Sequence, residues 1–251
     1  MSDDLILETR GLRKDFRGFT AVQGIDLKIR RGTIHAMIGP NGAGKTTVFN
    51  LLTKFLEPSG GRILYSGRDI TGARPAAVAR LGLIRSFQIS AVFARLSARD
   101  NVRVALQRRL GKSFHFWRSP RVLDPLDERA VELLDAVGLG AFADAPAATL
   151  PYGRKRALEI ATTLALEPEL MLLDEPMSGL GQEDIGRILA LIRAAGRGRT
   201  VLMVEHNLSV VAELSEVITV LTRGAILFEG DYAAVSKNPE VIEAYMGTGH
   251  A

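Results

Sequence analysis

The feature that most constrains the fold is a glycine-rich segment, Gly39–Thr47, with the sequence GPNGAGKTT. It satisfies the pattern G-x-x-x-x-G-K-[ST], and it lies between an apolar run at 33–38 and a helical pattern of apolar residues at 48–55. In that context the glycines let successive backbone N–H groups point at phosphate oxygens, and the helix N-terminus adds its positive end. The complete motif and its flanks argue against a chance glycine turn, so the sequence predicts an α/β fold with a nucleotide phosphate site.

Side chains of this loop have predicted roles as well. Lys45 is expected to reach the β- and γ-phosphates of ATP, and the Thr46 hydroxyl is expected to ligate Mg²⁺. The predicted ATP-binding residues of the loop are Gly39, Asn41, Gly42, Gly44, Lys45, Thr46 and Thr47.

Two carboxylates, Asp174 and Glu175, follow a second apolar run at 170–173. The carboxyl end of a strand is where ligands bind to an open α/β sheet. Asp174 is therefore predicted to hold Mg²⁺ through water, and Glu175 to polarise the water that attacks the γ-phosphate. A strand that ends in a solvated turn with two acids is the alternative, and the phosphate loop in the same chain favours the catalytic interpretation.

Hydrophobic periodicity predicts how the rest of the core is built. Apolar residues alternate with polar ones at 5–7 and 25–29, which predicts antiparallel strands with one buried face. Later in the chain the run at 170–173, a helical pattern at 185–192 and an apolar run at 201–204 alternate. This order of helices and strands argues for a parallel sheet flanked by helices.

The stretch 90–149 differs, because its apolar residues recur at helical spacing, and we interpret it as an inserted helical subdomain. A hairpin at 217–228 closes the fold. The prediction is one domain over residues 1–251, in which 1–89 and 150–251 form the core with an antiparallel β subdomain.

Composition excludes several classes of protein. The chain has 251 residues, 47% of them hydrophobic, and no cysteine, which rules out disulfides, thiolate metal sites and cysteine nucleophiles. The acidic N-terminal residues do not have the pattern expected of a signal peptide, and no apolar run approaches the roughly 20 residues that span a bilayer. The sequence therefore predicts a protein that is soluble or is carried by a membrane partner. The net charge of +4 would suit nucleic acid, anionic lipid or nucleotide phosphates, and a solvated basic face is the favoured interpretation.

Four further segments, in this order, resemble motifs of ABC-family nucleotide-binding domains, and the resemblance covers almost the full chain. Residues 85–88, RSFQ, resemble the Q-loop, and residues 150–154, LPYGR, take the place of the LSGGQ signature before a helix that begins near Lys155. Residues 178–181 lie at the D-loop, and residues 204–207, VEHN, end a strand with the switch histidine. The resemblance implies a P-loop NTPase fold with a mixed core sheet flanked by helices, an antiparallel β subdomain and an inserted helical subdomain.

The resemblance also implies roles for single residues. Gln88 would contact Mg²⁺ or the attacking water, and His206 would hydrogen-bond the γ-phosphate or that water. Phe16 is the favoured residue for stacking on adenine, and Phe19 is the alternative. The implied catalytic set is Glu175, His206 and Gln88, and the implied metal set is Thr46, Gln88 and Asp174. The signature residues that would bind the ATP of an opposite subunit are Leu150, Tyr152, Gly153 and Arg154.

Three features, one of them the basic, aromatic insert around 103–121, are similar to high-affinity branched-chain amino acid importers in particular. The signature contains Tyr152 and is followed by basic residues and LEIA, and residues 241–247 read VIEAYMG. Subfamilies for urea, short amides or aromatic acids share these motifs, so the solute stays open. The resemblance implies two membrane-spanning permease subunits and a second ATPase subunit, identical or different, at the cytoplasmic face of the membrane. An extracytoplasmic solute-binding protein would act indirectly, and no nucleic acid is implied.

Two positions depart from the family pattern. Pro151 replaces the signature serine and offers neither a hydroxyl nor an N–H, and Gly181 replaces the usual Asp or Asn of the D-loop. We hypothesise that Arg154, or the basic pair at 155–156, supplies part of the missing phosphate contact. A segment of uncertain role, Phe114–Trp117, would be either core of the helical subdomain or a contact for the membrane partner.

Two rival hypotheses are a non-transport ABC ATPase acting on ribosomes or DNA and an unrelated phosphate-loop enzyme such as a kinase. The first class usually carries two fused cassettes or a long coiled-coil insertion, neither of which is seen in this sequence. The second has no use for the segment 150–154 or for His206.

Overall fold

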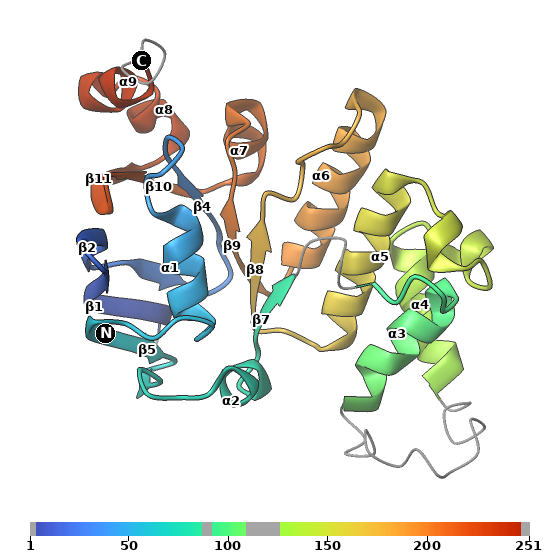
Figure 1. Ribbon diagram of the computed structural model, residues 1–251. Coiled ribbons are helices and arrows are strands. Elements are labelled where there is room, and N and C mark those ends of the chain that lie inside the picture. Colours follow the sequence, from blue (N-terminus) through green and yellow to red (C-terminus); the bar gives the residue numbers. More distant parts are fainter. Residues whose placement is uncertain (1–3, 87–91, 109–125, 247–251) are drawn as a thin grey trace. The chain divides into compact units, whose positions relative to one another are not determined.

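Figure 1 shows a computed structural model of the chain, which describes residues 4–86, 92–108 and 126–246. Contacts between residues divide it into two compact units. The first holds Met1–Arg85, Glu169–Pro176 and Gly196–Ala251, and the second holds Ser86–Pro168 and Met177–Ala195. Among the described helices, none combines the length and the apolar character that crossing a lipid bilayer requires. The boundaries predicted for a helical insertion stay a prediction.

An antiparallel sheet in the first unit confirms the predicted β subdomain. Its order is β2 (Phe19–Ile25), β1 (Leu5–Phe16), β5 (Gly60–Tyr65) and β6 (Arg68–Asp69), and β3 (Lys28–Arg30) also pairs with β1. Strand β1 is long because it pairs on both sides, with Val22 opposite Lys14 and Tyr65 opposite Leu7.

The second sheet is mixed, as the family resemblance implied. Its order is β11 (Ala225–Gly230), β10 (Val217–Thr222), β4 (Ile34–Ile38), β9 (Thr200–Val204), β8 (Leu170–Asp174) and β7 (Leu83–Ser86). Strands β10, β4, β9 and β8 pair in parallel, and β11 pairs antiparallel with β10. Every residue of β4 and β9 is buried, which is why both strands read as nearly continuous apolar runs. The parallel order brings the carboxyl ends of β4, β9 and β8 to one end of the sheet.

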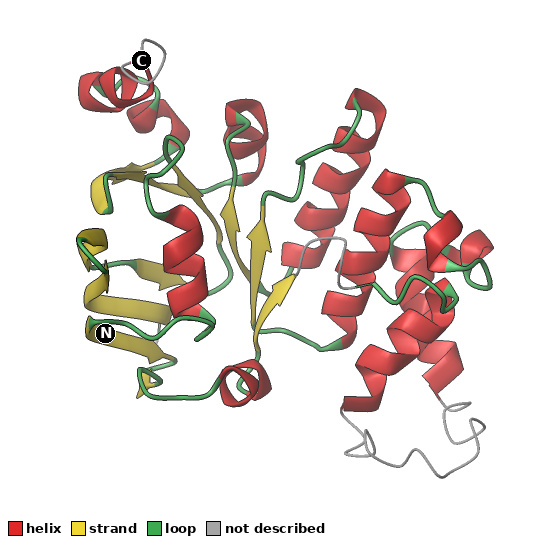
Figure 2. Ribbon diagram, viewed as in Figure 1, coloured by secondary structure: helices red, strands yellow, loops and turns green. Residues whose placement is uncertain are grey.

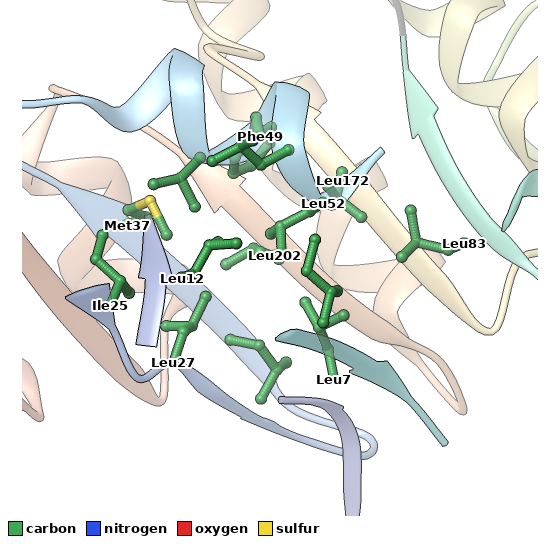
Figure 3. Close-up of a cluster of buried hydrophobic side chains, with 14 of the residues drawn as sticks. Leu7, Leu12, Ile25, Leu27, Met37, Phe49, Leu52, Leu83, Leu172 and Leu202 are labelled. Atoms are coloured by element: carbon green, nitrogen blue, oxygen red, sulfur yellow. The ribbon is translucent and has the colours of Figure 1, made fainter. Parts of the chain in front are cut away.

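A hydrophobic core holds helix α1 (Lys45–Leu52) in place, as Figure 3 shows. Phe49 and Leu52 of this helix are fully buried in one cluster with Leu12, Met37 and Leu202. Full burial of a Leu or Phe side chain contributes about 1.5–3 kcal/mol. These contacts fix the start of α1, and with it the loop that precedes the helix.

The end of α1 differs from the sequence prediction, in which the helical pattern ran to residue 55. The helix ends at Leu52, because Lys54 adopts a left-handed conformation with φ 64 and the Leu56 N–H donates to the carbonyl oxygen of Asn50 at 3.0 Å. Phe55 is therefore outside the helix and 54% exposed. The apolar spacing was misleading here, since one left-handed residue ends a helix whatever follows it.

Helices make up most of the second unit (Figure 2). They are α3 (Ala98–Gln107), α4 (Asp127–Ala136), α5 (Tyr152–Ala165) and α6 (Gln182–Gly196). Helices α3, α4 and α5 contact one another. Within α5, Arg156 and Glu159 form a buried ion pair at 2.6 Å, and burial raises the pKa of the Glu159 carboxyl. The first unit adds α2 (Pro75–Arg80), α7 (Leu208–Leu214), α8 (Tyr232–Val235) and α9 (Pro239–Met246).

A buried histidine lies inside the mixed sheet. His35 of β4 is 1% exposed, and its Nε2 lies 2.7 Å from Oγ1 of Thr219 on β10. The Thr219 hydroxyl donates to Glu229 of β11 at 2.7 Å, so the histidine nitrogen is the donor to Thr219. Burial lowers the pKa of His35 to about 4. The folded protein therefore holds this ring neutral.

We expect the free energy of unfolding to fall as the pH drops below the unfolded-state pKa of about 6.5, because the unfolded chain then binds a proton that the folded ring excludes. Between pH 7.5 and pH 5, His35 alone is expected to cost about 2 kcal/mol. That part of the pH dependence should be missing in His35→Gln, while other groups titrate alike in both proteins. Urea unfolding of both proteins at both pH values measures it, and parallel losses of stability would contradict the assignment.

Candidate nucleotide-binding site

The phosphate loop is shaped by glycines that no other residue could replace without strain. Gly39, Gly42 and Gly44 all have positive φ, and Gly44 caps the N-terminus of α1 with φ 99. A Cβ on Gly39 would lie 2.2 Å from the carbonyl oxygen of Leu221, and a Cβ on Gly44 would lie 2.8 Å from that of Ala21. The loop thus touches neighbouring backbone directly.

Lys45 is the first residue of α1 and folds back onto this loop. Its Nζ donates to the carbonyl oxygens of Gly39 at 2.6 Å and Pro40 at 2.9 Å. Burial lowers the pKa of Lys45, and the carboxylates of Glu175 and Asp174 oppose that shift. The structure therefore brings the predicted lysine and the two predicted acids within electrostatic reach of one another.

The two acids differ in their surroundings. Asp174 ends β8, and its Oδ2 accepts a hydrogen bond of 2.5 Å from Arg85 of β7. Glu175 follows in a left-handed conformation with φ 46, and its N–H donates to the carbonyl oxygen of Val204 at 2.9 Å. A non-glycine residue in this region costs about 1–3 kcal/mol, and such strain is concentrated at functional sites.

The residues predicted as metal ligands can be compared with what Mg²⁺ prefers. This ion is commonly held by one or two protein oxygens together with substrate phosphates, rather than by a complete protein cage. The exposed Thr46 hydroxyl in the first turn of α1 and the carboxylate of Asp174 are oxygens of that kind, so they fit the ion. The third predicted ligand, Gln88, lies outside the described residues.

His206 follows the end of β9, which pairs with β8 so that Val204 lies opposite Asp174. Glu205, fully buried, accepts the backbone N–H groups of His206 at 3.1 Å and Asn207 at 3.4 Å. His206 itself is exposed. A buried carboxylate thus fixes the backbone that presents the predicted switch histidine, a role that sequence reasoning did not assign to Glu205.

Both candidate adenine-stacking residues lie on the hairpin of β1 and β2. Phe16 and Phe19 are opposite one another in the register, and they are 44% and 64% exposed. The Lys14 ammonium lies 5.3 Å from the Phe16 ring centroid. An exposed aromatic ring can stack on a base, and both residues remain candidates.

The signature segment lies in the second unit. Helix α5 begins at Tyr152, three residues before the predicted start, because Pro151 takes the N-cap position with φ −56. Tyr152 is 44% exposed and its hydroxyl donates to the carbonyl oxygen of Ser178 at 3.0 Å, which joins the signature to the D-loop segment. Leu150 is buried. The Arg154 guanidinium stacks 3.8 Å from the Phe142 ring centroid.

Gly153 of the signature packs against the side chain of Asp184. A Cβ on Gly153 would lie 2.2 Å from the carboxyl carbon of Asp184. Asp184 in turn pairs with Arg187 at 3.0 Å. The aromatic segment Phe114–Trp117 lies outside the described residues, so its two interpretations stay as they were.

Comparison with known proteins identifies the family. Residues 22–178 match the family described as ABC transporter. The chain belongs to the ABC transporter family. Residues 225–251 also match the description branched-chain amino acid ATP-binding cassette transporter. As a member of the ABC family the chain is an ATP-hydrolysing subunit, which confirms the predicted fold class and enzyme activity.

Relatives span nearly the whole chain. The high-affinity branched-chain amino acid transport ATP-binding protein BraF of Pseudomonas aeruginosa is 40% identical, over 96% of this chain and 98% of that protein. LivG of Salmonella typhimurium is 36% identical over the same shares. The solved structures include a nucleotide-free ATP-binding cassette from an ABC transporter, with TM-score 0.83 at 26% identity over 96% of this chain and 98% of that chain. The ADP conformation of the cassette MJ1267 has TM-score 0.83 at 27% identity over 97% and 99%.

The packing of the loop predicts how two glycine substitutions differ. Gly42→Ala should cost about 1 kcal/mol of stability, because the residue has φ 79 but nothing lies within 4 Å of its Cβ position. Gly44→Ala should cost about 2 kcal/mol more, since the Ala21 carbonyl must move, and it should weaken nucleotide binding at least about tenfold. Urea unfolding and calorimetric titration with ADP measure both effects. Equal costs for the two variants would show that the close approach to Ala21 is unimportant.

Proposed function

We propose that this ABC ATPase energises import of branched-chain amino acids by Mg²⁺-dependent hydrolysis of ATP. Lys45 carries the chemical part of the proposal, because its ammonium donates to the loop carbonyls of Gly39 and Pro40 and is attracted by the carboxylates of Glu175 and Asp174. The solute is supported by the match of residues 225–251 and by the names of the relatives BraF and LivG.

The reaction depends on position and charge more than on covalent chemistry. Backbone N–H groups of the loop 39–47 and the Lys45 ammonium bind the phosphates of ATP. Thr46 would hold Mg²⁺ directly and Asp174 would hold it through water, and the ion would supply charge neutralisation. The Glu175 carboxylate accepts a hydrogen bond from the attacking water and polarises it. His206 is the residue proposed to hydrogen-bond the γ-phosphate or that water.

The proposed transporter contains a pair of ATPase subunits, the ATP molecules bound between them, and membrane-spanning subunits. Two ATPase subunits would bind two ATP molecules between them, each held by the phosphate loop of one subunit and the segment 150–154 of the other. The partner ATPase is either a second copy or a different chain. The pair would serve two membrane-spanning permease subunits at the cytoplasmic face of the membrane, with a solute-binding protein on the other side. Gln88 would report the nucleotide state to the permease.

Loss of the proposed base should abolish turnover but leave binding intact. We expect Glu175→Gln to lower kcat at least about 100-fold, because the amide cannot polarise water as a carboxylate does, while the Kd for ATP changes little. A matched control is Glu167→Gln, since Glu167 is exposed and has a similar left-handed conformation with φ 48. Phosphate release from the assembled transporter measures kcat. Normal turnover in Glu175→Gln would remove Glu175 from the mechanism.

The adenine-stacking proposal separates two neighbouring aromatic residues. Phe16→Ala should weaken ATP binding about tenfold, since aromatic stacking on a base is worth about 1–3 kcal/mol. Phe19→Ala should change the affinity little. Titration with a fluorescent ATP analogue compares the two variants, and the reverse order of effects would assign the stacking to Phe19.

Co-purification and uptake test the transport assignment. Tagged protein from gently solubilised membranes is expected to bring two multi-span proteins and an ATPase partner with it. Cells lacking the chain should lose high-affinity uptake of radiolabelled leucine and regain it with the wild type but not with Glu175→Gln. Recovery with ribosomes or DNA, or uptake restored only for urea, an amide or an aromatic acid, would overturn the assignment.

A further inference from the structure

Arg85 has a defined place in the site but no role among those predicted. It lies in β7, three residues before Gln88, and its guanidinium forks between two partners. One terminal nitrogen donates to Oδ2 of Asp174 at 2.5 Å, and the other donates to Oδ1 of Asn50 at 2.6 Å. The side chains of Arg85 and Asp174 are only 13% and 11% exposed.

Three elements fix the orientation of this arginine. Asn50 belongs to α1, the helix that begins at the phosphate loop, and Asp174 ends β8. The guanidinium also lies 5.9 Å from the ring centroid of Phe49, which is fully buried. Arg85 therefore links α1, β7 and β8, and few alternative rotamers would keep all three contacts.

Stability alone does not explain such a pair. The cost of removing two charges from water offsets most of their attraction, so a buried ion pair adds little to net stability. The fork has a geometric consequence instead. The hydrogen bond from Arg85 to Oδ2 of Asp174 restricts rotation of the carboxylate, which limits the directions that Oδ1 can take. Outer partners that fix a ligand in this way typically raise metal affinity about 10–100-fold.

We propose that Arg85 is a positioning residue that orients the Asp174 carboxylate for Mg²⁺, with Asn50 as the second support of the fork. This inference rests on the proposed function, in which Asp174 contributes to the metal site. The planar guanidinium matters as much as its charge, because a lysine ammonium cannot hold the two divergent oxygens in the same fixed geometry.

The test separates geometry from charge by using Arg85→Lys, which keeps the charge and loses the fork. The probe is a fluorescent ADP analogue, titrated in EDTA and over a range of Mg²⁺ concentrations. Mg²⁺ is expected to increase the affinity for the ADP analogue, and the Mg²⁺ concentration that gives half of this increase should be about tenfold higher in Arg85→Lys than in the wild type. The affinity measured in EDTA should differ between the two proteins by no more than about twofold. A protein with a merely structural change would lose affinity equally with and without Mg²⁺.

A matched control and a second variant keep the test decisive. Arg31 also forks between a carboxylate, Glu169 at 3.4 Å, and a neutral oxygen, Ser66 at 2.7 Å, but it is exposed. Arg31→Lys should leave the Mg²⁺ dependence unchanged. Asn50→Ala should raise the Mg²⁺ concentration needed for half of the gain in affinity about threefold. The double variant with Asn50→Ala and Arg85→Lys should need no more Mg²⁺ than Arg85→Lys alone, because both residues act through one fork.

Three outcomes would overturn the inference. They are a normal Mg²⁺ dependence in Arg85→Lys, an equal loss of affinity in EDTA and in Mg²⁺, and additive effects of the two substitutions. If the wild type itself gains no affinity from Mg²⁺, the proposed metal site fails together with the inference. If the wild type gains affinity and Arg85→Lys matches it, only the role of Arg85 fails.

Discussion

The site depends on one constraint, the approach of backbone to backbone around the phosphate loop. A Cβ on Gly44 or on Gly224 would lie 2.8 or 2.6 Å from the carbonyl oxygen of Ala21, and one on Gly39 would meet that of Leu221. The Gly224 N–H donates to the carbonyl oxygen of Ala43 at 3.0 Å. The turn between β10 and β11 and the strand β2 thus support the loop from outside. Residues far apart in sequence must all be small for the loop to keep its shape.

The shape of the phosphate loop also determines where the charged side chains of the site lie. Lys45 directly follows the last glycine of the loop, because α1 begins there. The ammonium is engaged by the loop's own carbonyl oxygens at 2.6 and 2.9 Å, and burial lowers its pKa. Two cations, Lys45 and Arg85, lie close to two carboxylates, Asp174 and Glu175. These four charges sum to zero, so the phosphates of ATP would bring uncompensated negative charge, and a divalent cation would offset it.

Local motifs were predictable from sequence, and contacts between distant segments were not. The phosphate loop and the acidic pair at 174–175 each consist of a few consecutive residues. The strands, turn and helix next to them could therefore be recognised from the sequence. The role of Arg85 could not, because its partner Asp174 is 89 residues away and only the sheet order makes them neighbours. The end of α1 was predicted too late, because the spacing of apolar residues does not indicate that Lys54 adopts a left-handed conformation. The choice between Phe16 and Phe19 stays open because both rings are exposed on one hairpin.

Arg85 and Asp174 both lie close to points at which the chain passes from the first unit to the second. The first unit consists of three segments of the chain. The chain leaves this unit after Arg85, and it leaves it a second time after Pro176, two residues beyond Asp174. One ion pair therefore joins two of the points at which the chain leaves this unit, close to the position that nucleotide and metal would occupy. The segment that begins after Arg85 contains Gln88, so the residue proposed to orient Asp174 lies only three positions before the glutamine of the predicted Q-loop.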